Sequence, residues 1–431
     1  MATITSAGIG SGLDINSIIS QLLAIERQPL VALERQETQL TAKLSEFGKM
    51  QGMVSAMRDK ANALSSSTLW SRTTGTSADT AVTISTANNA AVGAYAVQVQ
   101  QLAAVQTVSS RRFTTTDPAV FGPGTLTIEL GTYTGTPTVS GFDAKAGATA
   151  VTVTLGAEDD TLAEVRDKIN AANAGVTATV INDANGSRLA IRSKDSGAEN
   201  GFRITAAETN DDGVATNGLS ALAFDARSAS PMTFNQRAAN ALATINGIDV
   251  ESASNTLTDV SDGVSLKLVK TTTAPVEVTV AADSAAVKTA VEDFVKSYNE
   301  LANYIRTQTS FNEASQTGGP MQGDSLVLGI QRQMRAVLND ASSASSVFGR
   351  LSDVGLSLQR DGTLAINAST LDNGLANLGE LQKLFATNGT TNADSGFMRR
   401  FKELGDVLLG PEGAFDTRKD SLQARIDRNE E

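Results

Sequence analysis

Residues 11–64 read SGLDINSIISQLLAIERQPLVALERQETQLTAKLSEFGKMQGMVSAMRDKANAL. Within this stretch an apolar residue recurs every seventh position, and a second series follows three positions later: Leu33, Leu40, Phe47, Val54 and Ala61, then Met50, Met57 and Leu64. Apolar residues at alternating spacings of three and four lie along one narrow face of an α-helix. Because so narrow a strip must be covered by another helix, the sequence predicts a long helix with helical partners.

The partners that this strip requires lie near the other end of the chain. From Val287 to Ile305 the apolar residues again alternate in spacings of four and three, and helical periodicity returns around Leu404 and Leu422. We therefore expect the two chain ends to form one coiled-coil-like stalk. The residues predicted to pack in this stalk are Phe47, Met50, Val54, Met57, Leu64, Val287, Val291, Phe294, Tyr298, Leu301 and Ile305.

The sequence between the helical regions alternates apolar and polar residues over short runs bounded by Gly, Asn and Pro. That pattern is typical of half-buried antiparallel strands. Runs at 82–99 and 245–280 plausibly share one domain, while 118–235 resembles a separate insertion with one short helix, capped by Asp160 or Thr161. The predicted fold class is α+β multidomain: a helical stalk from both chain ends, with two β-rich domains inserted in the middle.

This pattern predicts four parts of the chain. They are a partly flexible terminal leg segment, 1–45; a helical stalk domain, 46–77 plus 284–431; a β-rich head domain, 78–117 plus 236–283; and an inserted outer β-rich domain, 118–235.

Composition narrows the possible functions. The 431 residues carry a net charge of −12, which disfavours nucleic acid as a partner. They include neither Cys nor His, which excludes disulfides, thiolate nucleophiles, His-based triads and the usual zinc sites. No secretory signal opens the sequence, and no apolar run is long enough to span a membrane, so membrane insertion is not expected.

Motifs for catalysis are weak. Gly8, Gly10 and Gly12 lack the preceding strand and the spacing of a dinucleotide loop. The carboxylate pairs at 159–160 and 211–212 could serve acid–base chemistry or hold calcium, but polar loop sequence favours solvated turns. We therefore expect no enzyme, no cofactor, no metal and no catalytic residue.

A band of apolar residues opens the first helix, before Pro29, which is expected to end or kink it. An ordinary core helix would show the same pattern. A band this apolar beside a glycine-bearing leader favours docking on another subunit instead. The predicted contact residues are Leu13, Ile15, Ile18, Ile19, Leu22 and Leu23.

Several stretches resemble the flagellar filament cap family, also called hook-associated protein 2. SGLDINSIISQLLAIERQPL at 11–30 resembles its N-terminal signature, and ATINGIDVESASNTLTDVSDGVSLKL at 243–268 resembles the asparagine-glycine motif of hook-associated and flagellin-type proteins. VEDFVKSYNELANYI, GPMQGDSLVLGIQRQMRAVL and LSDVGLSLQRDGTLAINASTL continue the resemblance in order. Residues 118–235 are only loosely similar.

The resemblance implies a structural cap at the distal tip of the bacterial flagellum, formed by a homo-oligomeric ring that is often a pentamer. Such a cap promotes flagellin polymerisation, prevents leakage of exported flagellin and is required for filament elongation and motility. Flagellin and a flagellar export chaperone are the implied partners. The implied location is extracellular, after export through the flagellar type III apparatus without a cleaved signal peptide.

Two further expectations accompany this one. The alternative function is a surface adhesin that binds a host glycan or protein through the outer β domain. The chain also stops in the charged stretch QARIDRNEE without a helix stop signal, whereas family members usually continue, so a truncated form is expected.

Overall fold

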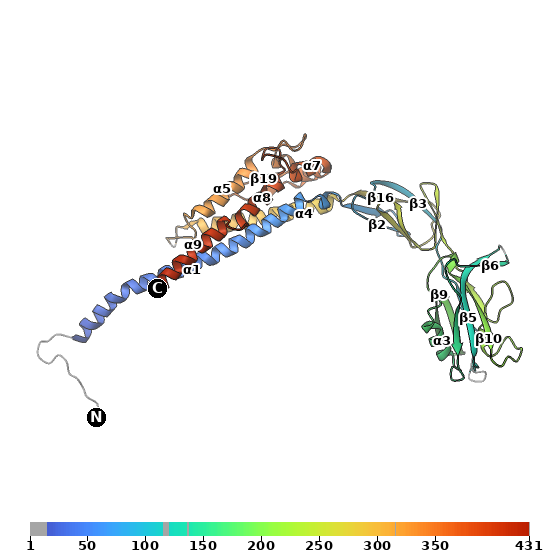
Figure 1. The fold of residues 1–431 in the computed structure, drawn as a ribbon. Helices are drawn as coiled ribbons and strands as arrows, with labels where there is room; N and C mark the ends of the chain where they lie inside the picture. The colour runs from blue at the N-terminus through green and yellow to red at the C-terminus, as the bar shows by residue number, and fades with distance from the viewer. Residues whose placement is uncertain (1–14, 115–119, 136–137, 315, 431) are drawn as a thin grey trace, which may run out of the picture. The chain divides into compact units, whose positions relative to one another are not determined.

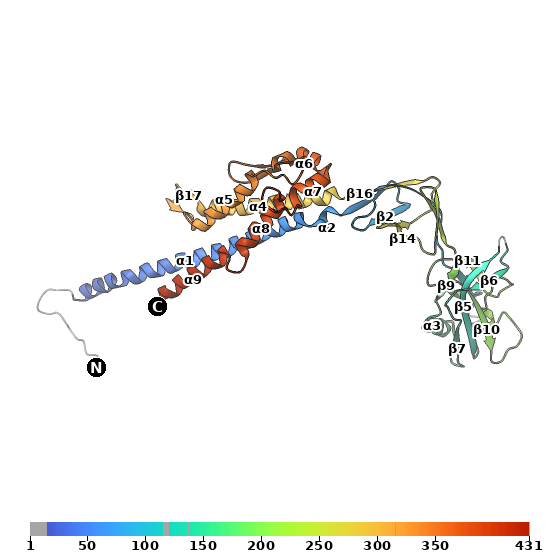
Figure 2. The same ribbon diagram turned by 45° about the horizontal axis from the view of Figure 1, so that its top comes forward.

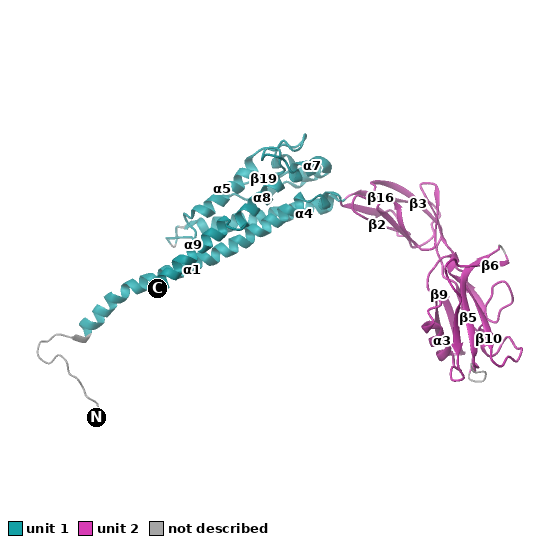
Figure 3. Ribbon diagram, in the orientation of Figure 1, with its two compact units in different colours: residues 1–71, 283–431 teal, residues 72–282 magenta. Residues whose placement is uncertain are grey.

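The computed structural model in Figure 1 describes residues 15–114, 120–135, 138–314 and 316–430. The chain divides into two compact units, which Figure 3 colours separately. The helical unit comprises residues 1–71 and 283–431, and the β unit comprises residues 72–282. The α+β multidomain fold predicted from the sequence is confirmed.

The helical unit is organised around α1, Ile15–Ser65. Three helices from the far end of the sequence pack against it: α4 (Ser284–Thr309), α8 (Phe397–Leu409) and α9 (Ala414–Glu430). Figures 1 and 2 both show α9 running beside α1. The N-terminal helix therefore packs with C-terminal helices, as the heptad strip predicts.

Smaller elements complete this unit. The short helices are α2 (Ser67–Trp70), α5 (Ser325–Asn339), α6 (Ala368–Leu375) and α7 (Leu378–Ala386). Two antiparallel hairpins join β17 (Phe311–Asn312) to β18 (Thr317–Gly318), and β19 (Leu356–Leu358) to β20 (Leu364–Ile366).

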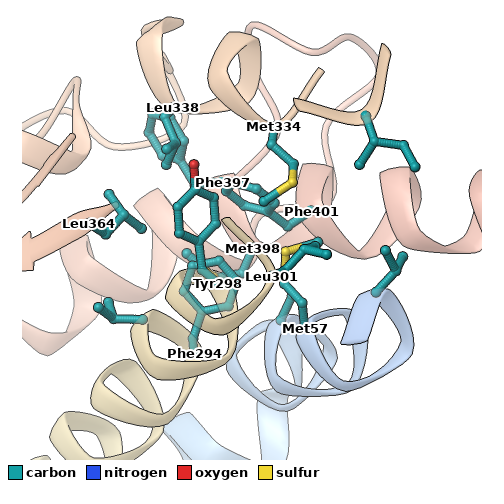
Figure 4. Packing of buried hydrophobic residues seen from close by; sticks show 14 of the residues in the cluster. Met57, Phe294, Tyr298, Leu301, Met334, Leu338, Leu364, Phe397, Met398 and Phe401 are labelled. Carbon is teal, nitrogen blue, oxygen red and sulfur yellow. The ribbon is translucent and has the colours of Figure 1, made fainter. Parts of the chain in front are cut away.

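Aromatic rings bring the helices of this unit together in one core (Figure 4). Phe294 of α4 and Phe401 of α8 have ring centroids 5.1 Å apart, and Tyr298 lies 6.0 Å from Phe401. Phe47 of α1 meets Phe415 of α9 edge-on at 6.5 Å. Large aromatic side chains bury much apolar area per residue, so these contacts between distant parts of the sequence stabilise the unit.

Pro29 does not end α1. The helix runs through it without interruption, and Pro29 lies on its exposed part. A proline inside a helix removes one backbone hydrogen bond, to the carbonyl four residues earlier. Water can satisfy that carbonyl because Ile25 and its neighbours are exposed. Pro29 was expected to end or kink the helix; the expected end is wrong, and the kink remains a prediction.

The β unit contains two separate hydrophobic cores. The inner core lies between a five-stranded sheet of order β1-β16-β3-β12-β13 and a three-stranded sheet of order β14-β15-β2. These strands are β1 (Thr73–Ser77), β2 (Val82–Thr86), β3 (Gly93–Gln101), β12 (Ala241–Ile245), β13 (Ile248–Ser252), β14 (Thr256–Ser261), β15 (Val264–Leu268) and β16 (Val276–Ala282). Asn246 and Gly247 close the β12–β13 hairpin with φ of 52° and 81°, the left-handed values of a tight hairpin turn.

The outer core is formed by two four-stranded sheets and one helix, α3 (Leu162–Ala171). The sheets contain β4 (Thr107–Ser109), β5 (Gly124–Thr134), β6 (Gly141–Ala144), β7 (Val151–Leu155), β8 (Val176–Asp183), β9 (Gly186–Ser193), β10 (Gly201–Glu208) and β11 (Thr233–Gln236). Thr161 caps α3: its hydroxyl accepts from the Glu164 N–H, and the Glu164 carboxylate accepts from the Thr161 N–H at 3.0 Å.

Two of the expected domain boundaries differ from the packing. β1 pairs with β16, so residues 73–77 belong with the β unit and not with the stalk. Val108 and Phe113 are buried in the outer core, although 78–117 was grouped with the inner domain. An alternating pattern identifies a strand, but it does not say which sheet the strand joins. The further division of the chain into four parts remains a proposal.

One buried side chain joins the two sheets of the outer core. Gln106, which has no exposed surface, donates from Nε2 to the Phe202 carbonyl at 2.7 Å and accepts from the Phe202 N–H at 3.1 Å. Its backbone exchanges hydrogen bonds with Ser193 of β9. The side chain therefore replaces a strand neighbour for β10 at this point.

We expect Gln106→Ala to destabilise the β unit by about 1–3 kcal/mol, because it leaves a buried N–H without its acceptor. Urea unfolding of the full chain, followed by circular dichroism, measures the loss. Gln236→Ala, an exposed position of the same unit, is the matched control and should change little. Equal midpoints for the two variants would contradict the role given to Gln106.

Candidate assembly surface

The most conspicuous surface of the helical unit is a row of exposed apolar side chains on α1. We call it the apolar strip: Ile18, Ile19, Leu22, Leu23, Ile25, Leu30 and Leu33. Their exposed fractions range from 42% for Ile18 to 60% for Ile25. Single exposed apolar residues are common on protein surfaces, whereas contiguous patches of them are rare. A row of this kind is therefore typical of a surface that another molecule covers.

The apolar strip continues the buried face of the same helix. Leu40 is 4% exposed and Phe47 is fully buried, whereas Leu33, seven residues before Leu40, is 43% exposed. The heptad strip predicts cover for Leu33 as well, and that expectation is wrong for the isolated chain. The internal helices bury α1 from Leu40 onward, so the remaining apolar length is available to a partner.

The predicted subunit-contact residues fall in two groups. Ile18, Ile19, Leu22 and Leu23 all lie on α1 and belong to the apolar strip. Leu13 lies outside the described residues, as does the side chain of Ile15. Their role in contacting another subunit remains a prediction.

The structure brings all of the predicted stalk-packing residues together in the core of the helical unit. Phe47, Met50, Val54, Met57 and Leu64 come from α1, and the rest come from α4: Val287, Val291, Phe294, Tyr298, Leu301 and Ile305. Each is buried. Phe397 of α8 and Met334 of α5 also lie in this core, although neither is among the predicted packing residues (Figure 4).

Polar contacts between α1 and α4 supplement the apolar ones. Lys60 and Asp293 form an ion pair at 2.7 Å, and the Tyr304 hydroxyl donates to the Glu46 carboxylate. Hydrogen bonds from Lys49 and then Tyr304 lower the pKa of Glu46, while burial and the nearby carboxylate raise that of Tyr304. Burial also raises the pKa of Tyr298 to about 12. These contacts orient the helices and leave the charges paired.

The carboxylate pairs singled out in the sequence occupy turns. Asp159 accepts a hydrogen bond from the Gly156 N–H at 2.8 Å and pairs with Lys168 at 3.1 Å, so its pKa is lowered. Asp211 and Asp212 accept from backbone N–H groups two residues ahead. Across the described residues, no group of three or more acidic, histidine or cysteine side chains gathers as a metal site would require.

The part of the chain that the structure describes contains no helix with the length and apolar character of a membrane span.

Family models match most of the chain. The model described as Flagellar hook-associated protein 2 C-terminus matches residues 238–431, and the model of the N-terminus matches residues 11–106. A third, described as Flagellin hook IN motif, matches residues 125–195. The stretch 243–268, whose resemblance to the family leads into its C-terminal region, lies within the C-terminus match.

Whole-chain comparisons agree with the family models. The flagellar hook-associated protein 2 of Escherichia coli (strain K12) is 32% identical over 383 residues, which cover 86% of this chain and 77% of the relative. The B-type flagellar hook-associated protein 2 of Pseudomonas aeruginosa is 30% identical over 98% of this chain and 87% of its own length.

A solved structure shares the fold. The crystal structure of the D1-D2-D3 domains of the flagellar cap protein from Escherichia coli aligns with a TM-score of 0.62 at 28% identity. The alignment covers 88% of this chain and 99% of that chain.

Proposed function

This chain belongs to the flagellar hook-associated protein 2 family of flagellar filament caps, and on that premise we propose that it is the structural cap at the distal tip of a bacterial flagellum. In this role it promotes flagellin polymerisation, prevents leakage of exported flagellin and supports filament elongation and motility. The family is structural and not enzymatic.

One observation carries the proposal: the apolar strip on α1 has no cover within the described residues of this chain. Fully burying a Leu or Ile side chain contributes about 1.5–3 kcal/mol, so covering seven partly exposed ones would favour association strongly. A protein that must bind neighbouring subunits or the filament end requires an apolar surface of this kind. Catalytic groups are not needed, because flagellin folding and packing supply the driving force.

The proposed assembly is a homo-oligomeric ring, pentameric as in many caps, with flagellin as its client and an export chaperone as its partner before assembly. The proposed location is outside the cell, after passage through the flagellar type III apparatus. In this arrangement α1 supplies the legs that contact the filament end, and the β unit supplies the part that closes the tip.

The proposal is tested by deleting the gene for this chain in its own bacterium. We expect motility to be lost and flagellin to appear unpolymerised in the medium, measured by swimming assays and by immunoblots of the supernatant. The wild-type gene should restore both properties. Intact filaments combined with lost adhesion would contradict the cap and favour the adhesin alternative.

A further inference from the structure

A hollow lined by positive charge lies between α1 and α9, directly beside the apolar strip. Its volume is about 470 Å³, and it is lined by Ala32, Arg35, Gln36, Gln39, Leu40, Lys43 and Arg425. Leu40, which lines the hollow, follows Leu33 of the apolar strip by seven residues, so the two lie on the same face of α1. The apolar strip therefore reaches one wall of the hollow.

A second hollow extends the first. It measures about 340 Å³, shares Gln39 and Lys43 with the first, and is closed by Gly318–Pro320 at the end of the β17–β18 hairpin. We call the surface formed by Arg35, Lys43 and Arg425 with the amides of Gln36 and Gln39 the basic saddle.

Among the described residues, the three cations of the basic saddle have no anionic partner. Some other cations of the helical unit are paired: Lys288 lies 2.7 Å from Asp372, and Arg418 contacts Asp324 at 2.5 Å. Within the described residues, no ion pair involves Arg35, Lys43 or Arg425, and no carboxylate lines the hollow.

This arrangement is contrary to the charge of the whole chain, which is −12. Like charges gathered in one hollow repel each other, so the cluster is best stabilised by anions from outside. Guanidinium groups bind carboxylates with paired N–H donors, and the glutamine amides add further donors.

We propose that the basic saddle binds the carboxylates of an acidic helix from a partner protein, whose apolar face covers the apolar strip. This inference rests on the proposed function, since it names the chemistry of the partner that the same surface receives. A small free anion would fill the basic saddle but leave the apolar strip exposed. A helix with an apolar face and adjacent acidic residues satisfies both.

A second copy of α1 fits this surface less well. Its exposed carboxylates at Glu26 and Glu34 are each followed by an arginine, Arg27 and Arg35. Such a helix would bring as much positive charge to the basic saddle as negative charge. Charge complementarity therefore favours a different, acidic protein.

Fluorescently labelled poly-L-glutamate tests the basic saddle on the full chain by fluorescence anisotropy. We expect binding that weakens as salt rises, since counterions screen exposed charges. The variant Arg35→Gln/Lys43→Gln/Arg425→Gln should bind at least about tenfold more weakly, as expected when three exposed ion pairs are lost. The control Lys267→Gln/Lys296→Gln/Arg360→Gln removes the same charge at exposed positions elsewhere and should bind as the wild type does.

Three results would overturn the proposal: no binding by the wild type, an equal loss in both triple variants, or unchanged binding by the saddle variant. Leu22→Gln/Leu23→Gln separates this inference from the proposed function. It should bind poly-L-glutamate normally while losing assembly, so failure of the cap and failure of the basic saddle give different outcomes. Impaired self-association of the saddle variant in sedimentation velocity would identify a second copy as the occupant and would also overturn the proposal.

Discussion

We expect Val291→Asp to abolish the cooperative unfolding of the helical unit. Val291 has no exposed surface and lies on α4 in the core that α1, α4 and α8 share. A carboxylate at this position must either remain ionised in an apolar core or take up a proton there, and either outcome costs several kcal/mol. Because domains are stable by only about 5–15 kcal/mol, one such group removes most of the stability of this unit. Val54→Asp, on α1, should act in the same way.

Differential scanning calorimetry of the full chain measures this effect. The transition of the helical unit should disappear from the variant, while that of the β unit should remain. Val407→Asp is the matched control, because Val407 lies on α8 with 73% of its surface exposed. An unchanged thermogram for Val291→Asp would refute the packing of α4 against α1.

Leu22→Gln/Leu23→Gln should abolish assembly without reducing stability. Both side chains are more than half exposed, at 56% and 52%, so folding gains little from them. Glutamine matches leucine closely in helix propensity, which keeps α1 intact. If an interface buries both residues, losing them costs about 3 kcal/mol, or roughly a hundredfold in the association constant.

Sedimentation velocity over a range of concentrations measures this second effect. The wild type should associate as concentration rises, and the variant should remain a monomer with an unchanged thermal midpoint. Leu328→Gln/Val407→Gln removes two exposed apolar side chains on α5 and α8 and should assemble normally. Association of the strip variant at wild-type concentrations would refute the role of the apolar strip.

Much of the helical architecture could be predicted from spacing. The interval of seven from Leu40 to Ala61 and the four-three alternation from Val287 to Ile305 define helix faces, because side chains at these intervals share one side of a helix. The structure places both faces in one core. The alternating strands could likewise be recognised in the sequence, since successive side chains of a strand point to opposite faces.

The limits of each element were harder to predict. Judged from the neighbouring sequence alone, Pro29 is a signal for the end of a helix. In the structure α1 continues through it, and Pro29 lies on an exposed part of the helix. Residues 107–113 read TVSSRRF and show no clear alternation, and only their contacts place Val108 and Phe113 in the outer core. Gln106 carried no signal, because a glutamine beside a strand is ordinarily a surface residue.

Only part of the candidate site could be predicted from the sequence. The apolar character of residues 18–23 is visible in the sequence, whereas the unpaired state of Arg35 and Lys43 is not. Arg425 is far from both in sequence, and only the antiparallel packing of α9 against α1 brings the three cations together.

By itself the sequence determined that both chain ends are helical, that the middle is β-rich, and which faces are apolar. These properties follow from periodicity, which depends on local backbone geometry alone. The tertiary structure decided where α1 ceases to be buried by other helices, between Leu33 and Leu40. It also decided which strands share a core. It also decided that three cations meet without a carboxylate. These properties depend on contacts between residues distant in sequence, and a local pattern carries no information about which distant surface a face will meet.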